Sequence, residues 1–285
     1  MNTNKEKVLI TGARGFIGKE TIKKLKKNYI IYAISSKDIK NIKNVFYYNY
    51  NRKKLSFLKN IKIDYLINCH GKILNDNFKN IHDDHLKFSQ KLFKNIDHNY
   101  LKKIIHIGSM DEYSNFIKGK DRDLKENPTS NYAKVKQLVS NYTLTFAKKN
   151  NIDCIILRIF LAYGKTQKRP RLIPYLKYCI KNKKIADLND YTAIKSFIHI
   201  DDLIKIINFV IQNKMKHNIY NISNDRKYSI KSIARLLKEK YNLNFTYKIK
   251  QKPKSQYLTN SKINKEYKFK YRNFYEELQQ IIVSK

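Results

Sequence analysis

The sequence predicts an α/β protein built on a doubly wound parallel sheet, and three observations support this. Short, almost wholly apolar runs, the pattern of buried parallel strands, recur along the chain. Between many of them lie segments with apolar residues at helical spacing. With 285 residues, the chain can bury a large core in one large domain or in two closely associated ones.

Composition excludes some classes of protein and weakens others. No stretch approaches the roughly 18 apolar residues of a membrane span, and the first residues run directly into a strand, so we expect a cytoplasmic protein without a signal peptide. The three cysteines are few and widely spaced, which favours reduced thiols over a disulfide framework or a metal site. The formal net charge of +37 invites a nucleic-acid-binding function, but lysine is spread along the whole chain. We therefore attribute the charge to compositional bias and expect no nucleic-acid partner.

The first strand and helix are predicted by residues 8–25, where three glycines separate an apolar run from a helical pattern. Such a turn directs backbone N–H groups and the positive end of the helix dipole to one spot, which suits a phosphate. Gly12 would allow the turn, Gly15 would let a pyrophosphate approach the backbone, and Gly18 would let the helix lie close to the strand. The alternative is a tight turn without a ligand.

Two later segments accompany this turn. Ser109 follows another apolar run, and Tyr132 and Lys136 stand four residues apart at the start of a helical pattern. Together with residues 11–18 they resemble the extended branch of the short-chain dehydrogenase/reductase family, the NAD(P)-dependent epimerases, dehydratases and reductases of nucleotide sugars. The resemblance covers nearly the whole chain and implies a Rossmann sheet and a homodimer. In the glycine turn it implies cofactor contacts from Gly12, Arg14, Gly15, Phe16, Ile17 and Gly18.

The second predicted strand, residues 29–34, ends in Ser35-Ser36-Lys37. NAD-selective relatives carry an acidic residue here that binds the ribose hydroxyls, whereas Asp38 of this chain comes late. The hydroxyls and Lys37, together with Arg14, would suit a 2′-phosphate. This favours NADP(H), with NAD(H) as the alternative; a polar loop without a cofactor role is the other interpretation.

The third and fourth predicted strands supply further cofactor candidates. Asn49 follows the third strand, residues 45–48, where relatives place an Asp on the adenine amine; its amide oxygen can accept the same hydrogen bond. The fourth strand ends at Cys69 and His70 beside the expected cofactor. We expect Cys69 to contact the cofactor and His70 to serve packing or cofactor contact rather than acid–base chemistry. Residues 80–95 then predict one core-facing helix.

Tyr132 and Lys136 share a helix face because they are four residues apart. A free tyrosine has a pKa near ~10, and a neighbouring ammonium lowers it. By resemblance, Lys136 also holds the nicotinamide ribose, and Ser109 hydrogen-bonds the substrate oxygen that Tyr132 protonates or deprotonates. Met110, directly after Ser109, is a candidate substrate contact.

The later part of the chain predicts a further buried strand at residues 152–160, then a basic stretch and a helix at residues 172–180. Relatives place basic residues here on the nucleotide diphosphate, and Arg171 is the candidate. Asp201 or Asp202 is expected to cap a following helix. The remaining predicted elements are a strand at 218–223 and helices at 230–241 and 274–282. We expect residues 1–165 and 196–222 to form the NAD(P)-binding Rossmann domain and residues 166–195 and 223–285 the smaller substrate-binding lobe.

The motifs favour some reactions over others. Dehydratases of the family carry Asp-Glu directly after the catalytic Ser or Thr, whereas Met110 here displaces Asp111 and Glu112 by one residue. Epimerases keep NAD bound, whereas reductases take in fresh NADPH, which suits the missing acidic residue. The sequence therefore favours reduction of a nucleotide-bound 4-keto-6-deoxy sugar. The alternatives are an NAD-dependent nucleotide-sugar epimerase and a non-catalytic scaffold or RNA-binding protein.

Overall fold

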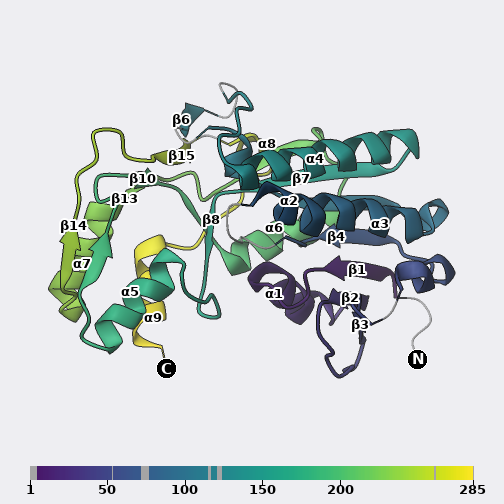
Figure 1. Ribbon diagram of the computed structural model, residues 1–285, viewed down its shortest axis with the longest axis horizontal. Helices are drawn as coiled ribbons and strands as arrows, with labels where there is room; N and C mark the ends of the chain where they lie inside the picture. Colours follow the sequence, from purple (N-terminus) through teal and green to yellow (C-terminus); the bar gives the residue numbers. More distant parts are fainter. Residues whose placement is uncertain are drawn as a thin grey trace. The chain divides into compact units, whose positions relative to one another are not determined.

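The computed structural model describes residues 5–52, 54–71, 77–114, 117–120, 124–259 and 261–284, and it divides into two compact units (Figure 1). The first unit consists of Met1–Glu112, Asn127–Arg158 and Ile204–Tyr220. The second unit consists of Tyr113–Glu126, Ile159–Leu203 and Asn221–Lys285. Both ranges predicted for the substrate-binding lobe fall in the second unit, and its substrate-binding role stays a prediction. Residues 113–126, 159–165, 196–203 and 221–222, which the sequence assigns to the NAD(P)-binding domain, fall in the second unit as well.

A seven-stranded parallel sheet has the strand order β12-β7-β5-β4-β1-β2-β3. Its strands are β1 (Lys7–Thr11), β2 (Ile30–Ser35), β3 (Val45–Asn49), β4 (Tyr65–Asn68), β5 (Lys103–Ser109), β7 (Asp153–Ile159) and β12 (Ile219–Ile222). From β1 the chain first builds outward through β2 and β3, and then returns to the other side of β1 with β4. The predicted doubly wound sheet is confirmed, and its strand order reverses between β1 and β4, where such sheets bind ligands.

Both faces of this sheet are covered. The consecutive residues Val8, Leu9 and Ile10 of β1 are all 0% exposed, although successive side chains of a strand point to opposite faces. On one face, Leu9 belongs to a buried cluster with Phe93 and Ala147. The helical segments of the first unit include α1 (Phe16–Leu25), η1 (Leu55–Asn60), α2 (Phe78–His82), η2 (Asp83–Lys87), α3 (Phe88–Asn95), η3 (His98–Tyr100), η4 (Met110–Glu112) and α4 (Asn131–Lys149).

The helical segment at residues 80–95 differs in one respect from the single regular helix that the sequence predicts. It is regular in α2 and α3, but the five residues of η2 between them form a π-helical turn. A π-turn widens the helix and changes which side chains face inward, and hydrophobic spacing alone does not reveal it. This turn places Asp84 and His85 near the end of β4.

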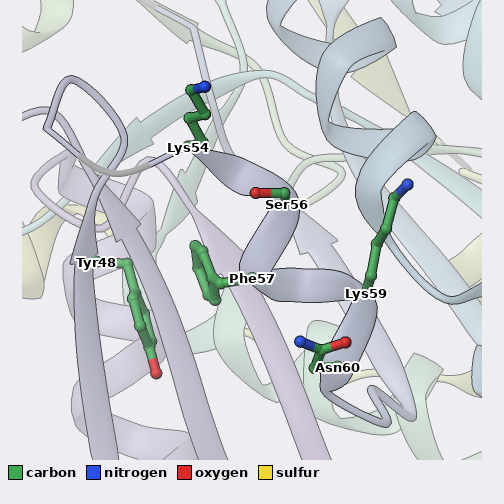
Figure 2. Close-up of a pocket in the computed structure, with 6 residues that line it drawn as sticks. All are labelled: Tyr48, Lys54, Ser56, Phe57, Lys59 and Asn60. Carbon is green, nitrogen blue, oxygen red and sulfur yellow. The ribbon is translucent and has the colours of Figure 1, made fainter.

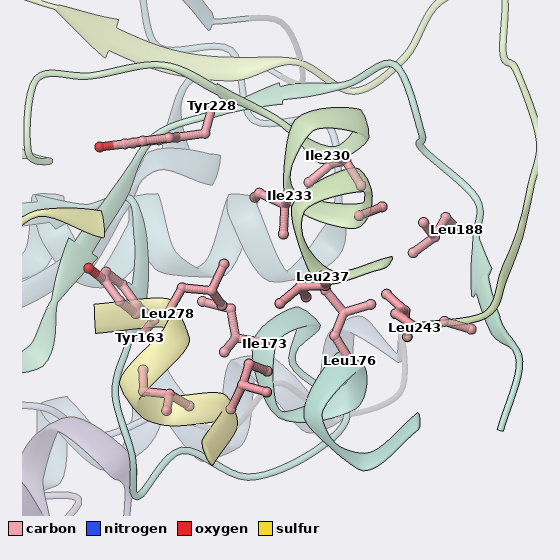
Figure 3. Close-up of a cluster of buried hydrophobic side chains, with 14 of the residues drawn as sticks. Tyr163, Ile173, Leu176, Leu188, Tyr228, Ile230, Ile233, Leu237, Leu243 and Leu278 are labelled. Atoms are coloured by element: carbon pink, nitrogen blue, oxygen red, sulfur yellow. The ribbon is translucent and has the colours of Figure 1, made fainter. Parts of the chain in front are cut away.

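Where the structure describes it, the second unit contains small sheets and helices of its own. Its sheets are β13-β10-β15-β6, β11-β8 and β14-β9. Their strands are β6 (Ile117–Lys120), β8 (Leu161–Tyr163), β9 (Ala186–Leu188), β10 (Ile194–Lys195), β11 (Phe197–His199), β13 (Tyr228–Ser229), β14 (Phe245–Tyr247) and β15 (Gln256–Thr259). The helices are α5 (Leu172–Lys181), α7 (Ile230–Tyr241), α8 (Lys262–Tyr267) and α9 (Phe274–Val283). Leu176 of α5, Leu237 of α7 and Leu278 of α9 are 0% exposed and meet in its core (Figure 3).

Helix α6 (Ile200–Gln212) begins in the second unit and continues into the first. Asp201 and Asp202 lie inside its first turn, so the prediction that one of them is the N-cap is wrong. Instead, His199 Nδ1 accepts the backbone N–H of Asp201 at 3.2 Å, and Asp202 Oδ2 accepts the backbone N–H of Arg272 at 2.9 Å. Over the described ranges, neither this helix nor any other has both the length and the apolar character of a membrane span.

Candidate cofactor and catalytic site

The glycine turn after β1 has the close backbone contacts that the spacing predicts. Gly12 has a φ of +65°, and a Cβ there would lie 2.6 Å from the carbonyl oxygen of Cys69. A Cβ at Gly18 would collide with the Gly12 carbonyl. Gly15 is different: apart from its chain neighbours, the Gly12 carbonyl oxygen at 3.1 Å is the one described atom within 4 Å of a Cβ built there. Two glycines are therefore required by protein packing, whereas a Cβ at the third would meet one backbone oxygen, at a distance shorter than most Cβ contacts.

Helix α1 begins at this glycine turn. Gly15 is the N-cap residue, and in the described part of the chain no side chain caps the helix and its first turn has no acidic residue. Gly15 and Arg14 are exposed, and Phe16 and Ile17 are half-buried. Free N–H groups at the positive end of a helix dipole, with an arginine beside them, fit the pyrophosphate of a dinucleotide.

The ends of β2 and β3 form a polar network. Ser35 Oγ accepts the backbone N–H of Lys37 at 3.1 Å. Asn49 Nδ2 donates to Asp38 Oδ1 at 3.2 Å, and Asp38 Oδ2 lies 2.8 Å from a guanidinium nitrogen of Arg52. Sequence reasoning set Asp38 aside because it comes late, and it did not consider Arg52. A carboxylate does lie beside these strand ends, and an arginine balances its charge.

The ends of β1 and β4 are tied together at the point where the strand order reverses. Thr11 Oγ1 donates to Asn68 Oδ1 at 2.7 Å and accepts the backbone N–H of His70 at 3.1 Å. This holds Cys69 against the glycine turn. Burial raises the pKa of the Cys69 thiol to about 12, while the nearby charge of Lys136 lowers it. The thiol therefore stays protonated and suits a packing contact rather than nucleophilic chemistry.

Lys136 connects α4 to the end of β5. Ser130 begins the helix by accepting the backbone N–H of Ala133 at 3.1 Å. One turn later, Lys136 Nζ donates to the carbonyl oxygen of Ile107 at 2.6 Å, two residues before Ser109. Lys136 is 4% exposed, and burial lowers the pKa of its ammonium, while the charge of Glu112 opposes that shift. Tyr132 is half-buried on the same helix face.

Ser109 ends β5, and its hydroxyl is held by the turn that follows. Its Oγ accepts the backbone N–H of Asp111 at 3.2 Å and donates to Asp111 Oδ2 at 3.3 Å. The hydroxyl group of Ser109 therefore has a defined orientation. Met110, the predicted substrate contact, is 5% exposed.

A buried ion pair beneath this turn was missed by sequence reasoning. Glu112 Oε2 lies 2.9 Å from Arg158 Nε, and the two side chains are 0% and 2% exposed. Glu112 Oε1 also accepts the backbone N–H of Ser109 at 2.7 Å. Glu112 thus supports the turn that follows β5, called the β5 loop below. An arginine within the apolar run of β7 was the signal that could have indicated a buried partner.

Arg171 is exposed at the N-cap position of α5, in the second unit. Figure 2 shows an open pocket beside β3 and η1 that contains none of the predicted site residues. It is lined by Tyr48, Lys54, Ser56, Phe57, Lys59 and Asn60. Tyr48 and Phe57 stack with ring centroids 4.1 Å apart, so part of the lining of this pocket is aromatic.

Comparison with known proteins gives consistent similarities. A protein 27% identical to this chain is the ADP-L-glycero-D-manno-heptose-6-epimerase of Brachyspira hyodysenteriae, with 82% of this chain and 81% of that protein covered. The dTDP-4-dehydro-6-deoxyglucose reductase of Escherichia coli is 26% identical, with 85% and 84% covered.

Solved structures share the fold over nearly the full length. The UDP-glucuronic acid 4-epimerase of Bacillus cereus, in complex with UDP-glucuronic acid and NAD, has a TM-score of 0.83 at 22% identity. The match covers 97% of this chain and 98% of that chain. The UDP-glucose 4-epimerase of Thermotoga maritima has a TM-score of 0.82 at 17% identity, with 97% of both chains covered. The family model described as NAD dependent epimerase/dehydratase matches residues 8–223, from β1 to just beyond β12. With this match over most of its length, the chain belongs to the NAD-dependent epimerase/dehydratase family.

Proposed function

We propose that this protein is a nucleotide-sugar oxidoreductase that reduces a 4-keto-6-deoxy sugar, with Tyr132 as the proton donor. The observation that carries the proposal is the bond from Lys136 Nζ to the Ile107 carbonyl at 2.6 Å. It anchors the helix face of Tyr132 and Lys136 to the end of the strand that carries Ser109. Similarity to the Escherichia coli reductase supports the choice of reaction.

A nicotinamide dinucleotide fits the residues around the glycine turn, because Gly15 is exposed at the N-terminus of α1, where no described side chain caps the helix. When bound in its reduced form, this cofactor supplies a hydride. The residues that we assign to it are Gly12, Arg14, Gly15, Phe16, Ile17, Gly18, Ser35, Ser36, Lys37, Asn49, Cys69 and Lys136.

The protein's own groups would manage the proton and the position of the substrate. Tyr132 gives its phenolic proton to the substrate oxygen as that oxygen gains negative charge. The ammonium of Lys136 stabilises the phenolate left behind. Ser109 hydrogen-bonds the same substrate oxygen by turning its hydroxyl hydrogen, which Asp111 Oδ2 accepts in this structure, toward the substrate. Met110 and Arg171 are proposed substrate contacts, and the second unit is proposed to bind the nucleotide sugar.

The cofactor preference that we propose is for NADP(H). Ser35, Ser36 and Lys37 offer hydroxyls and a cation at the end of β2, and Arg14 adds a second cation. Asp38 would oppose a 2′-phosphate, but its pairing with Arg52 offsets its charge. Fluorescence titration with NADPH and with NADH tests this preference; tighter binding of NADH would contradict it.

An epimerase is the second candidate, favoured by the carboxylate of Asp38 at the strand ends and by similarity to the heptose epimerase. The two candidates differ in cofactor use. A reductase consumes one NADPH for each dTDP-4-keto-6-deoxyglucose turned over, whereas an epimerase forms product without net oxidation of an added cofactor.

The Tyr132→Phe variant tests the mechanism. We expect turnover to fall by about 10²–10⁴-fold, because the proton donor is lost while packing is kept. The dissociation constant for NADPH should be unchanged. Near-normal turnover by this variant would refute the proposed role of Tyr132. If neither cofactor binds the parent protein, a non-catalytic scaffold becomes the better interpretation.

A further inference from the structure

A buried imidazole lies against the proposed proton donor. The side chain of His85 is 2% exposed. Its ring centroid lies 5.9 Å from that of Tyr132, and the two ring planes are 89° apart. This is the edge-to-face arrangement in which the positive edge of one aromatic ring meets the negative face of the other. The contact therefore constrains the direction of the Tyr132 ring as well as its position.

His85 lies in the π-helical turn η2. In a regular α-helix, consecutive residues point in directions about 100° apart. Within η2, the consecutive side chains of Asp84 and His85 are both largely buried, at 19% and 2% exposed. Asp84 Oδ2 lies 3.6 Å from His70 Nε2 and 3.9 Å from His85 Nε2. His70 Nε2 also lies 2.9 Å from the Asp84 carbonyl oxygen. These contacts hold the π-turn against the end of β4.

The backbone after β4 contacts the same imidazole. Gly71 has a φ of +144°, a conformation that favours glycine, and a Cβ there would lie 2.7 Å from His85 Cε1. The ring of His85 thus has the Gly71 backbone as a close neighbour and the Tyr132 ring as another. No larger residue fits at position 71 unless the imidazole moves.

We propose that His85 is a positioning residue for Tyr132, packed against the Gly71 backbone so that its ring fixes the orientation of the phenol. This inference rests on the proposed function, in which Tyr132 gives a proton to the substrate. It assigns the π-turn to the active site, because the turn presents His85 to Tyr132. The aromatic ring, rather than the imidazole nitrogens, is the part that acts.

Two substitutions by residues of similar size distinguish the effect of the aromatic ring from the effect of the imidazole nitrogens. His85→Phe keeps an aromatic ring for Tyr132 to pack against, whereas His85→Leu fills the space without one. With dTDP-4-keto-6-deoxyglucose and NADPH, we expect kcat to stay within about threefold of the parent in His85→Phe and to fall by about tenfold or more in His85→Leu. KM and the dissociation constant for NADPH should change little in either. His98→Ala is the matched control, because His98 makes a similar edge-to-face contact, at 6.3 Å and 86°, with Phe146.

A second readout does not depend on turnover. In the ligand-free protein labelled with ring-¹³C tyrosine, the Tyr132 resonance is identified by its absence from Tyr132→Phe. Its chemical shift in His85→Phe should equal that in the parent protein, where the neighbouring ring displaces it. In His85→Leu it should move toward the mean chemical shift of exposed tyrosines. Parent-like kcat and spectrum in His85→Leu would overturn the inference, and so would equal loss of kcat in both variants. If Tyr132→Phe retains turnover, the proposed function itself fails, which is a distinguishable result.

Discussion

Single residues beneath the β5 loop show how much a buried charge depends on its partner. Glu112 and Arg158 are almost fully buried, and Glu112 also accepts the backbone N–H of Ser109. A buried ion pair adds little net stability to the fold, because both charges lose their hydration. Removing one partner costs much more, since the other charge then stays buried without compensation. The pair therefore matters chiefly because it fixes the loop that carries Ser109.

Removing one member of this pair should strongly destabilise the protein. We expect Arg158→Met to lower the free energy of unfolding by about 3–5 kcal/mol, because the Glu112 carboxylate is left buried without its cation. Urea denaturation measures this change. Arg52→Met is the matched control: its pair with Asp38 has a similar distance of 2.8 Å, but the two side chains are 75% and 59% exposed. It should cost at most about 1 kcal/mol, and equal losses in the two variants would refute the argument.

The glycine turn permits a second test at this scale. Gly12→Ala should weaken NADPH binding and lower Tm, because a Cβ at a φ of +65° would lie 2.6 Å from the Cys69 carbonyl oxygen. Gly119→Ala shares the strain of a positive φ, here +122°, but no described atom lies within 4 Å of its Cβ. Titration with NADPH and thermal unfolding compare the two. An unchanged NADPH affinity in Gly12→Ala would show that the turn does not shape the cofactor site.

At the scale of elements, the C-terminal end of α6 is joined to the start of β5 by one lysine. Lys103 Nζ donates to the carbonyl oxygens of Val210 at 2.8 Å and Asn213 at 2.7 Å, and it lies 3.2 Å from Asp153 Oδ2. Helix C-termini leave carbonyl groups without helical partners and attract cations. Lys103 is 6% exposed, so water cannot readily replace it.

Lys103→Met should therefore release this end of the helix. We expect a loss of about 1–3 kcal/mol in the free energy of unfolding, with faster hydrogen exchange in the last turn of α6. Lys102→Met is the control: Lys102 forms ion pairs with Glu6 and Asp64, but its side chain is 55% exposed. If exchange in α6 is the same in both variants, Lys103 does not anchor the helix.

At the scale of the whole molecule, buried tyrosines make stability sensitive to alkaline pH. Tyr65 is an example: its hydroxyl donates to Glu6 Oε1 at 2.8 Å, and burial, followed by that hydrogen bond, raises its pKa to about 12. Burial also raises the pKa of Tyr163 and Tyr271. In the unfolded chain these phenols ionise near ~10. Their contribution to stability is thus complete below about pH 10 and is lost as the pH rises toward the folded values.

The free energy of unfolding should accordingly fall between about pH 10 and pH 12, and less steeply in Tyr65→Phe, which removes one of the shifted groups. Urea denaturation at several pH values measures the slope. Tyr100→Phe, at a position that is 43% exposed, serves as the control. A slope in Tyr65→Phe equal to that of the parent would contradict this reasoning.

The sequence by itself determined the parts of this protein that depend on local pattern. Apolar runs marked the parallel strands, glycine spacing marked the turn after β1, and the four-residue spacing of Tyr132 and Lys136 placed them on one helix face. Resemblance to a family added Ser109 and a nucleotide-sugar reaction. These features depend on residues that are close together in the sequence, so periodicity and spacing suffice to find them.

Only the tertiary structure decided the pairs that join distant residues. Glu112 and Arg158 are 46 positions apart, and β6 pairs with β15 although residues 117–120 and 256–259 are far apart in the chain. His85, which meets Tyr132, lies in a π-turn that hydrophobic spacing does not reveal. Polar residues have no periodic pattern that identifies a partner. Which charge, ring or strand each one meets is set by how the whole chain packs, because burial selects the contacts that satisfy them.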